Sequence, residues 1–499
     1  MSLYPDRIRL QSLTDKITTA EEAAKLVKNG NTVGMSGFTR AGEAKKLPIA
    51  MAERARHEEL KITLITGASL GHDSDKILVE AGVLARRMPF QVDTTLRAAI
   101  NRGEVMFTDQ HLSETVEFLR AGQYGDLDVA VLEAVAITED GGIVPSSSVG
   151  NSASFAILAK KIIIELNLAQ PAEFEGLHDI WIPHRRPERE PLPLTRVSDR
   201  IGSATVHVPP EKIAAIVITR TPDSPSNAQA PDAETQQIAN HLIEFFKHEV
   251  RRGRMPDPLP PIQSGIGTIA NAVLTGFLHA PFEHLTMYSE VLQDSTFELI
   301  DAGKMDFASA SSITVSKAMQ EQVFGHLERY RDKLVLRPQE VSNHPEVIRR
   351  LGLIALNTAL EADIYGNVNS THVRGSHMMN GIGGSGDFAR NAFMAIFATK
   401  SVAKDGRISS IVPMVPHVDH NEHDVDILVT EQGLADLRGL APRERALAVI
   451  ENCAHPSYRP LLRDYYNDAL KYGGHTPLAL ERAFEMHIRL RDTGSMLPA

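Results

Sequence analysis

The chain has 499 residues and a formal net charge of −11, and 42% of its residues are hydrophobic against 23% charged. This balance is that of an ordinary globular protein and excludes a disordered or fibrous class, while the acidic charge argues against a nucleic-acid binder. The length exceeds one ordinary core, so we expect about two or three domains.

Cysteine content and hydropathy bear on the compartment. The single cysteine, Cys453, cannot form an internal disulfide, which fits a reducing environment. The N-terminus is charged and interrupted, and no apolar run reaches the roughly 18 residues that span a bilayer. We therefore expect a cytoplasmic protein without a membrane segment.

The first half of the chain alternates two kinds of segment. Short β-branched runs predict strands at residues 31–38, 61–69, 127–137 and 160–167. Segments of helical period predict helices at residues 21–30, 48–59 and 76–88. Strands that alternate with helices predict an α/β fold with mainly parallel sheets and flanking helices.

A proline-rich stretch follows. Residues 219–234, TRTPDSPSNAQAPDAE, have little apolar content and no periodicity, which is typical of a linker. We expect an N-terminal domain at 1–222, a linker at 223–232 and a C-terminal domain at 233–499.

The second half partly repeats the first. The segment from Leu132, LEAVAITEDGGIVPSSSVGNS, aligns with the segment from Leu360, LEADIYGNVNSTHVRGS. Each precedes an apolar helix-like stretch and then a strand with a glutamate, Glu165 in the first copy and Glu431 in the second. This pattern predicts two similarly built α/β domains.

A first glycine cluster opens a predicted helix. Gly265, Ile266 and Gly267 begin a G-x-G-x-x-A pattern, and the next predicted strand, HLTMYSEV, carries Glu290 near its end. One interpretation is a dinucleotide-binding fold in which Glu290 holds a ribose hydroxyl. A purely structural turn is the alternative, and under either interpretation the helix start supplies main-chain N–H groups that stabilise negative charge.

A second glycine cluster is denser. Gly381, Gly383, Gly384 and Gly386 lie close together and lead into Asp387. The structural interpretation is a flexible turn with Asp387 as the helix N-cap. The functional interpretation is that a ligand approaches the main chain closely, so that amides donate to an oxyanion.

Glu290 between such loops is a candidate nucleophile. A carboxylate that attacks a thioester forms a mixed anhydride, and the tetrahedral intermediate requires preorganised donors. The alternative is a partly buried structural glutamate held by a helix start.

A family resemblance rests on motifs along nearly the whole chain. They are SGFTRAG, LITGAS, QSGIGTIANAV, MYSEVLQDS, ASASS, VLRPQEVSNHPEVIRRLG, EADIYGNVNST, MNGIGGSGDFARNA, TEQGLADLRGL and DTGSMLP. With these motifs the chain resembles the acetyl-CoA hydrolase/transferase family of class I coenzyme A transferases, and within it the succinate:acyl-CoA transferases that use acetate or propionate. The resemblance implies two α/β domains of the class I type with the active site at their interface.

The resemblance also implies residue roles. It makes Glu290 the nucleophile, which forms an acyl-glutamyl anhydride and then a glutamyl-CoA thioester in ping-pong kinetics. It places the oxyanion donors on the amides of Ile266 and Gly384, an active-site amide on Asn343, a second carboxylate on Glu431, and a CoA-contacting cation on Lys404. It implies CoA thioesters as substrates, no tightly bound cofactor, no metal, and a homodimer.

The substrate is left open in part. The implied reaction moves CoA between acetyl-CoA or propionyl-CoA and a carboxylate such as succinate or acetate. Some family members place an arginine in the inter-domain loop, but the loop after Arg220 contains none. An acyl-CoA hydrolase with the same residues, a nicotinamide oxidoreductase and a non-catalytic CoA-binding module are the rival hypotheses.

Two further features have structural interpretations. His417, His420 and His423 are spaced as metal ligands could be, yet hydrogen-bonded loop histidines are the favoured interpretation. Cys453 and His455 stand two residues apart, a spacing that does not bring side chains face to face on a helix. We expect Cys453 to be buried and inert.

Overall fold

The computed structural model describes residue 4, residues 6–227 and residues 229–498. The chain forms two compact units: unit 1 comprises residues 1–227, 286–297 and 306–351, and unit 2 comprises residues 228–285, 298–305 and 352–499. The boundary near residue 227 lies within the predicted linker at 223–232, of which Ala228 is outside the described residues. However, the segment that carries Glu290 belongs to unit 1 by compactness, so the units are not two consecutive halves.

Unit 1 contains a sheet of eight strands in the order β1-β10-β9-β6-β2-β3-β4-β5, in which every neighbouring pair is parallel. Its strands are β1 (Ile17–Thr18), β2 (Thr32–Met35), β3 (Ile62–Ile65), β4 (Leu84–Met88), β5 (Met106–Phe107), β6 (Val129–Ala134), β9 (Lys161–Asn167) and β10 (Ile213–Thr219). Its helices are α1 (Ala20–Ala24), α2 (Leu47–Ala55), α3 (Ser74–Glu80), α4 (Thr94–Asn101), α5 (Thr115–Arg120) and α6 (Ser152–Leu158).

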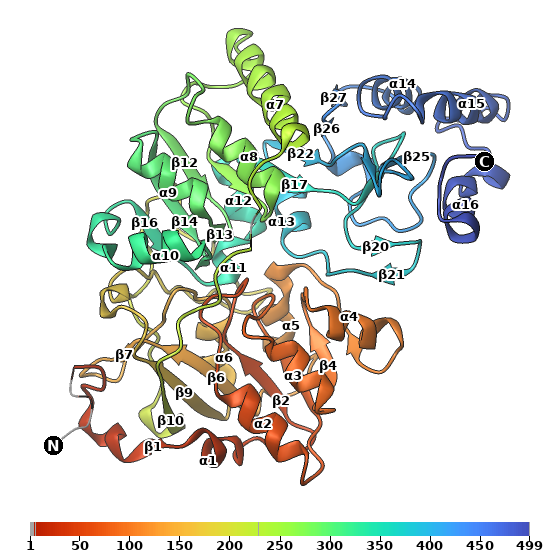
Figure 1. The fold of residues 1–499 in the computed structure, drawn as a ribbon. Coiled ribbons are helices and arrows are strands. Elements are labelled where there is room, and N and C mark those ends of the chain that lie inside the picture. Colours follow the sequence, from red (N-terminus) through yellow and green to blue (C-terminus); the bar gives the residue numbers. More distant parts are fainter. Residues whose placement is uncertain (1–3, 5, 228, 499) are drawn as a thin grey trace. The chain divides into compact units, whose positions relative to one another are not determined.

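Helices cover both faces of this sheet. Along β2, Val33 and Met35 point into a core with the apolar residues of α1 to α4, and these helices are neighbours in sequence order (Figure 1). On the other face a Cβ at Gly34 would lie 2.7 Å from the ring of Phe155 in α6, so the glycine makes room for that helix. This arrangement confirms the predicted α/β class.

One predicted helix is wrong over half its length. Residues 76–88 form α3 only up to Glu80, and the chain then continues as β4. Gly82 takes a left-handed φ of 72° and ends the helical stretch, and Leu84 and Met88 are buried in the sheet. The helical period of the sequence therefore came from a short helix followed by a strand, with a glycine turn between them.

Unit 1 also contains the antiparallel pair β7 (Ala136–Ile137) and β8 (Ile143–Val144), and it takes in elements from later in the chain. These are β12 (Leu285–Tyr288) and β14 (Met305–Ala310), each without its first residue, and β13 (Val291–Leu292), β15 (Ser312–Ile313), α10 (Lys317–Phe324), β16 (Leu334–Leu336), α11 (Gln339–Ser342) and α12 (Pro345–Leu351). The strand β14 lies between β16 and β12, and β13 pairs with β15. The helix α9 (Asp294–Asp301) is divided between the units after Phe297.

Unit 2 is built on the strand order β11-β17-β22-β26-β27, parallel except for the last pair. These strands are β11 (Ile262–Ser264), β17 (Ile354–Thr358), β22 (Met394–Ala398), β26 (Ile427–Thr430) and β27 (Gly433–Asp436). Short strands join them: β18 (Glu361–Asp363), β19 (Val368–Asn369), β20 (His372–Val373), β21 (His377–Met378), β23 (Val402–Ala403), β24 (Ile408–Ser409) and β25 (Ile411–Val412). The helices are α7 (Ala233–Arg251), α8 (Thr268–Gly276), α13 (Ser385–Asn391), α14 (Pro442–Asn452), α15 (Arg459–Leu470) and α16 (Glu485–Thr493).

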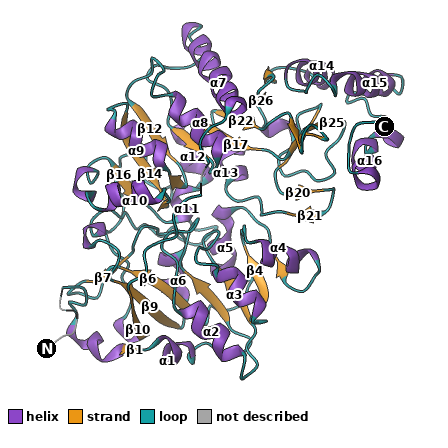
Figure 2. Cartoon of the chain, in the orientation of Figure 1, coloured by secondary structure: helices purple, strands orange, loops and turns teal. Residues whose placement is uncertain are grey.

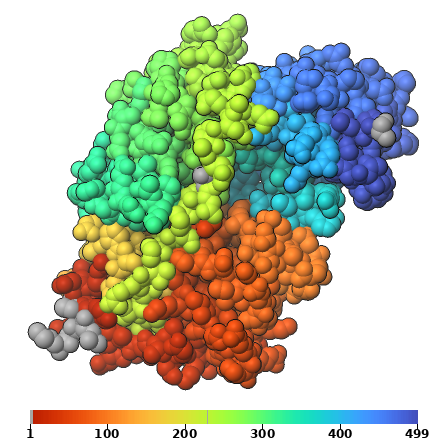
Figure 3. Space-filling model, viewed as in Figure 1, coloured from red at the N-terminus to blue at the C-terminus, as the bar shows by residue number. Residues whose placement is uncertain are grey.

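The helices of unit 2 bury apolar faces on its sheet. Phe397 of β22 and Leu428 of β26 share a core with α14 and α15, which contact each other. The long helix α7 packs on α8 and on the strands β26 and β27, and its outer face forms part of the molecular surface (Figure 3). Figure 2 shows the strands of each unit with helices around them. Among the described residues, no helix combines the length and the hydrophobicity required to cross a bilayer.

The strand orders support the predicted duplication and correct one detail of it. The order β10-β9-β6-β2 in unit 1 matches β26-β22-β17-β11 in unit 2, and β3-β4-β5 matches β12-β14-β16. By this correspondence β9, which carries Glu165, matches β22 rather than β26. The two glutamates are therefore not equivalent, and their similarity in sequence comes from the common pattern of a buried strand with a polar end.

Candidate active site

Glu290 lies in the two-residue break between β12 and β13. The predicted strand at 284–291 thus ends at Tyr288, and the main chain turns at the acid. The main-chain carbonyl of Glu290 accepts hydrogen bonds from the N–H groups of Ser311 at 2.9 Å and Ser312 at 3.1 Å. Because both donors belong to one ordered segment, the backbone that carries the carboxylate is fixed.

The side chain of Glu290 meets Asn343. The Nδ2 group of Asn343 donates to Oε1 of Glu290 at 2.9 Å. Burial raises the pKa of Glu290 to about 7, and the hydrogen bond from Asn343 opposes that shift only in part. Near neutral pH the carboxyl group therefore exchanges easily between its two protonation states, which suits a reactive carboxylate.

Asn343 is fully buried at the end of the short helix α11. The preceding strand β16 ends at Leu336, and one helical turn intervenes before Asn343. The hydroxyl of Tyr288 donates to the main-chain carbonyl of Val341 at 2.5 Å, and the N–H of Gln339 donates to Gly150 at 2.8 Å. These bonds fix the helix whose end presents the amide.

Sequence reasoning gave no role to Tyr288 or Ser311. Tyr288 is buried two residues before Glu290 and bonds to the helix that ends at Asn343. Ser311 donates its hydroxyl to the carbonyl of Arg337 at 3.0 Å and accepts the N–H of Gly150 at 3.1 Å. A usable signal was present in the serine-rich segment 308–312, ASASS, which begins in the buried end of β14.

In unit 2 the first glycine cluster forms the turn between β11 and α8, as predicted. Gly267 is the N-cap with a φ of 122°, a conformation that side chains rarely adopt, although a Cβ there would meet no atom within 4 Å. The requirement for glycine is therefore conformational. Gly265 donates its N–H to Leu356 at 2.9 Å, and Ile266 is 42% exposed.

The second glycine cluster forms the turn before α13. Gly381 and Gly383 have positive φ values of 147° and 61°. The N-cap of α13 is Gly384, while Gly386 and Asp387 lie in the first turn of the helix. The interpretation of Asp387 as N-cap is therefore wrong, because the helix begins earlier.

Glu431 follows β26, at the strand end where the sequence placed it. Its carboxylate accepts the main-chain N–H of Ser401 at 2.8 Å, the hydroxyl of Ser401, and the amide of Gln432 at 3.0 Å. Burial alone would raise the pKa of Glu431, but these hydrogen bonds outweigh it and the pKa is lowered. Glu431 is thus an anion at neutral pH, in contrast to Glu290.

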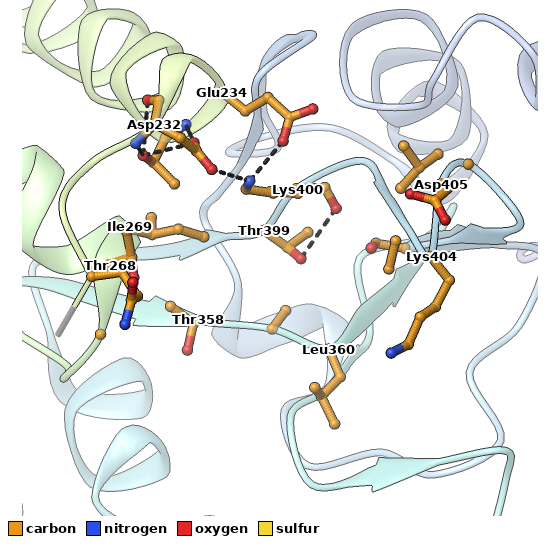
Figure 4. Close-up of a pocket in the computed structure, with 18 of the residues that line it drawn as sticks. Asp232, Glu234, Thr268, Ile269, Thr358, Leu360, Thr399, Lys400, Lys404 and Asp405 are labelled. Atoms are coloured by element: carbon orange, nitrogen blue, oxygen red, sulfur yellow. Dashed lines mark hydrogen bonds and ion pairs between the residues drawn. The ribbon is translucent and has the colours of Figure 1, made fainter. Parts of the chain in front are cut away.

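A pocket of about 820 Å³ opens within unit 2, beside the start of α8. Ile266 and Gly267 line it together with Lys404 from the turn between β23 and β24. Lys400 also lines it, but its ammonium group forms ion pairs with Asp232 and with Glu234 (Figure 4). Lys404 extends from the opposite side, and no ion pair is drawn to it among the residues of this view.

The structure brings the predicted site residues together in separate sets. Glu290 and Asn343 touch in unit 1. In unit 2, Ile266, Gly267 and Lys404 line the same pocket. Glu431 lies in a separate hydrogen-bonded cluster with Ser401. The other glycines of the two clusters are not among the residues that line the pocket: Gly265, Gly383, Gly384 and Gly386.

Cys453 and the loop histidines, for which the sequence favoured structural roles, contact other groups of the protein. Cys453 is fully buried, and burial raises the pKa of its thiol to about 12. His417 contacts Asp419 at 3.2 Å, and His420 contacts the hydroxyl of Ser385 at 3.0 Å. These groups have protein partners, as expected of loop histidines.

The comparisons with known proteins agree with this fold. Residues 1–218 match the acetyl-CoA hydrolase/transferase N-terminal domain, and residues 320–466 match the C-terminal domain of the same family. The chain belongs to the acetyl-CoA hydrolase/transferase family.

Three curated relatives cover nearly the whole chain. It is 50% identical to the succinyl-CoA:acetate CoA-transferase of Clostridium kluyveri, over 98% of this chain and 92% of the relative. It is 47% identical to an acetyl-CoA hydrolase of Schizosaccharomyces pombe, over 99% of both chains. It is 46% identical to the propanoyl-CoA:succinate CoA transferase of Escherichia coli, over 96% of this chain and 98% of the relative.

Solved structures support the fold. RipA from Yersinia pestis matches with a TM-score of 0.72 at 22% identity, over 93% of this chain and 99% of the other. A 4-hydroxybutyrate CoA-transferase from Porphyromonas gingivalis matches with a TM-score of 0.64 at 22% identity, over 92% of this chain and 99% of the other. The chain is thus an enzyme with a CoA-transferase fold, and the family supports CoA transfer or hydrolysis rather than nicotinamide chemistry.

Proposed function

We propose that the enzyme transfers CoA between acetyl-CoA or propionyl-CoA and a carboxylate such as succinate or acetate, through a covalent intermediate on Glu290. The observation that carries the proposal is the placement of Glu290 in the break after β12, with its carboxylate held by Asn343. The names of the relatives from Clostridium kluyveri and Escherichia coli support the substrate classes.

The proposed reaction has two half-reactions. The Glu290 carboxylate attacks the thioester carbonyl and CoA leaves as the thiolate, which gives a mixed anhydride. The thiolate then attacks the glutamyl carbonyl, releases the first carboxylate and leaves a glutamyl-CoA thioester. A second carboxylate reverses these steps, so that one acyl-CoA and one carboxylate are formed in ping-pong kinetics.

The environment of Glu290 supports this chemistry. A carboxylate that is partly removed from water is less stabilised by hydration, and the raised pKa reports that cost. Asn343 donates one hydrogen bond, which orients the carboxylate. Because the amide is neutral, it does not add a positive charge that would lower the nucleophilicity of the carboxylate. Glu290 is therefore ionised in part and poorly solvated at neutral pH.

The roles in unit 2 are proposed on the family resemblance. Lys404 is a cation in a pocket of about 820 Å³, a volume suited to a part of CoA. The amides of Ile266 and Gly384 are proposed as oxyanion donors, and the ionised Glu431 as the second carboxylate. The predicted domains at 1–222 and 233–499, with a linker at 223–232, are likewise proposed as the sequence domains of the family.

The test uses purified enzyme mixed with acetyl-CoA or propionyl-CoA and no acceptor. We expect a mass gain of CoA less water on the peptide that contains Glu290, and no gain in Glu290→Gln. Borohydride should convert the thioester on this glutamate to an alcohol, which marks the same peptide. Turnover by the wild type without any adduct would contradict the covalent mechanism.

Hydrolysis is the second candidate, because the relative from Schizosaccharomyces pombe is named an acetyl-CoA hydrolase. A hydrolase would release free CoA and the carboxylate steadily without an acceptor, whereas a transferase would release the carboxylate only up to one equivalent of enzyme and would keep the CoA as a thioester on Glu290. With succinate a transferase would form succinyl-CoA and no free CoA, so free CoA and succinyl-CoA measured with and without succinate distinguish the two activities.

We also propose a cytoplasmic location, on the cysteine content and hydropathy of the sequence, and a homodimer, as the resemblance implies. Light scattering coupled to size-exclusion chromatography tests the assembly, since a monomer of 54.7 kDa and a dimer differ twofold in mass.

A further inference from the structure

We propose that His420 is a positioning residue, which fixes the glycine turn at Ile382–Ser385 through the hydroxyl of Ser385. The inference rests on the proposed function, in which the amide of Gly384 in this turn stabilises the oxyanion. It adds a residue that touches neither substrate nor the reacting atoms.

The turn is built largely from glycine. Gly381 and Gly383 have positive φ values, and Gly384 caps the helix that follows. Glycines have more accessible backbone conformations than any other residue, so a turn built from them does not define its own geometry. An amide donor in such a turn has to be oriented from outside, because catalysis requires a preorganised direction.

A hydrogen-bonded chain of three groups supplies that orientation. The hydroxyl of Ser385 donates to the main-chain carbonyl of Ile382 at 2.8 Å and closes the turn. The Nε2 atom of His420 lies 3.0 Å from the same hydroxyl oxygen. Since a hydroxyl has one hydrogen, which goes to Ile382, the oxygen accepts from His420, and Nε2 carries the proton.

His420 is itself firmly held. It is 2% exposed, and its ring lies 4.6 Å from the ring of Phe397, measured between centroids. Its main-chain N–H donates to Val368 of β19 at 3.1 Å, and the two residues form a β-bridge. The imidazole therefore fixes the turn relative to the buried strand β19.

The neighbouring residue Asp419 also helps to hold the loop that carries His420. The carboxylate of Asp419 accepts the N–H of Ser370 at 2.7 Å and the hydroxyl of Thr371 at 2.8 Å. The hydroxyl of Ser370 also lies 3.4 Å from Nε2 of His420. The loop before and after His420 is thus tied to the segment that follows β19.

The experiment compares single-turnover formation of the Glu290 adduct in six proteins: the wild type, His420→Leu, His420→Gln, Ser385→Ala, the double variant His420→Leu/Ser385→Ala, and His423→Leu. The side chain of His423 is 83% exposed, which makes that variant a matched control. The amide of glutamine reaches about as far as Nε2 and restores a donor. Thermal unfolding is recorded for each protein to separate lost folding from lost rate.

We expect His420→Leu to slow adduct formation at saturating acyl-CoA by roughly tenfold, which is less than the full loss of an oxyanion donor. The acyl-CoA concentration at half saturation should change less than twofold. Ser385→Ala should have a similar effect, the double variant should be no worse than either, and His420→Gln should recover part of the rate. His423→Leu should match the wild type.

Three outcomes would overturn the inference. The first is an unchanged rate in folded His420→Leu, and the second is additive losses in the double variant. The third is an acyl group on Ser385 in the wild type, because His420 would then be a base for a serine nucleophile. An absent adduct on Glu290 in the wild type would instead contradict the proposed function, so the two failures are distinct.

Discussion

At the residue scale, the proposed chemistry depends on the protonation of Glu290. The carboxylate is the proposed nucleophile, and its pKa is raised to about 7 by burial. We therefore expect kcat/KM for acyl-CoA to rise with pH and to level off above about pH 7. Asn343→Leu removes a hydrogen bond that favours the ionised form, so the inflection should move to higher pH.

Asn452→Leu is the control for this pH profile. Its side chain is exposed and donates to Ala448 within its own helix, so the inflection should remain that of the wild type. If Asn343→Leu left the inflection in place, Asn343 would not contribute to the pKa of Glu290.

The same pKa predicts an effect on stability. The folded-state pKa of Glu290 lies above the value of about 4.3 for an unfolded glutamate, so the folded state binds more protons between these values. Stability should fall as pH rises from about 4 to about 7, by at most roughly 3 kcal/mol. Glu290→Gln lacks this ionisation and should exceed the wild type in stability at pH 8 but not at pH 4. Urea unfolding at both pH values measures the difference, and an equal difference at both would contradict the assignment.

Lys404 should contribute to acyl-CoA binding by its charge. A charge-assisted hydrogen bond is worth about 1.5 kcal/mol or more, so Lys404→Gln should raise KM for acyl-CoA roughly tenfold with little change in kcat. Lys471→Gln is the control, since Lys471 is exposed and pairs with Asp468 on its own helix. Steady-state kinetics at two salt concentrations should show the difference shrinking at high salt, and equal KM values for both variants would remove Lys404 from the site.

At the element scale, the site depends on how α11 is attached to β12. The hydroxyl of Tyr288 is the link between them, and both it and its acceptor on Val341 are buried. Tyr288→Phe removes one of the hydrogen bonds to that carbonyl, which still accepts the N–H of His344 at 3.1 Å, so we expect a loss of about 0.5–1.5 kcal/mol in unfolding free energy. Because Asn343 follows α11, kcat should fall as well.

A second buried tyrosine separates these two effects. Tyr365 donates its hydroxyl to the carbonyl of Pro477, in a different part of the chain. Tyr365→Phe should cost comparable stability, measured by urea unfolding, and should leave kcat unchanged. If both variants lost kcat equally, the loss would reflect stability and not the position of Asn343.

The sequence predicted the elements well where each pattern was local. The strands at β2, β3, β6 and β9 and the glycine turn before α8 were found, because period and turn residues are properties of a short segment. The helix over 76–88 was wrong because Gly82 divides two short elements. Tyr288 and Ser311 were missed as contributors because their bonds join segments distant in sequence.

At the scale of the whole molecule, the compact units cut across the chain order. Residues 306–351 hydrogen-bond to the first 227 residues within unit 1: Leu336 donates to Leu177 at 3.0 Å, and Asp179 donates to Leu336 at 2.9 Å. A fragment of residues 1–222 lacks these partners. We expect it to unfold at lower urea concentration and less cooperatively than the full chain, as measured by circular dichroism.

A fragment as cooperative as the full chain would contradict this expectation, because the later segment would then add nothing to unit 1. The predicted division of the sequence at 223–232 could not reveal this, since a linker composition marks where a chain is extended and not which segments pack together. Long-range hydrogen bonds are invisible to local patterns.

The matching strand orders have a consequence for stoichiometry. By strand order β12 corresponds to β3, so Glu290, two residues after β12, corresponds to Gly67, two residues after β3. A Cβ at Gly67 would lie 2.8 Å from the carbonyl oxygen of Gly37, so this position does not accommodate a side chain. The first copy of the fold is thus closed to a second acid, so the proposed covalent thioester can form at only one of this pair of positions in each chain.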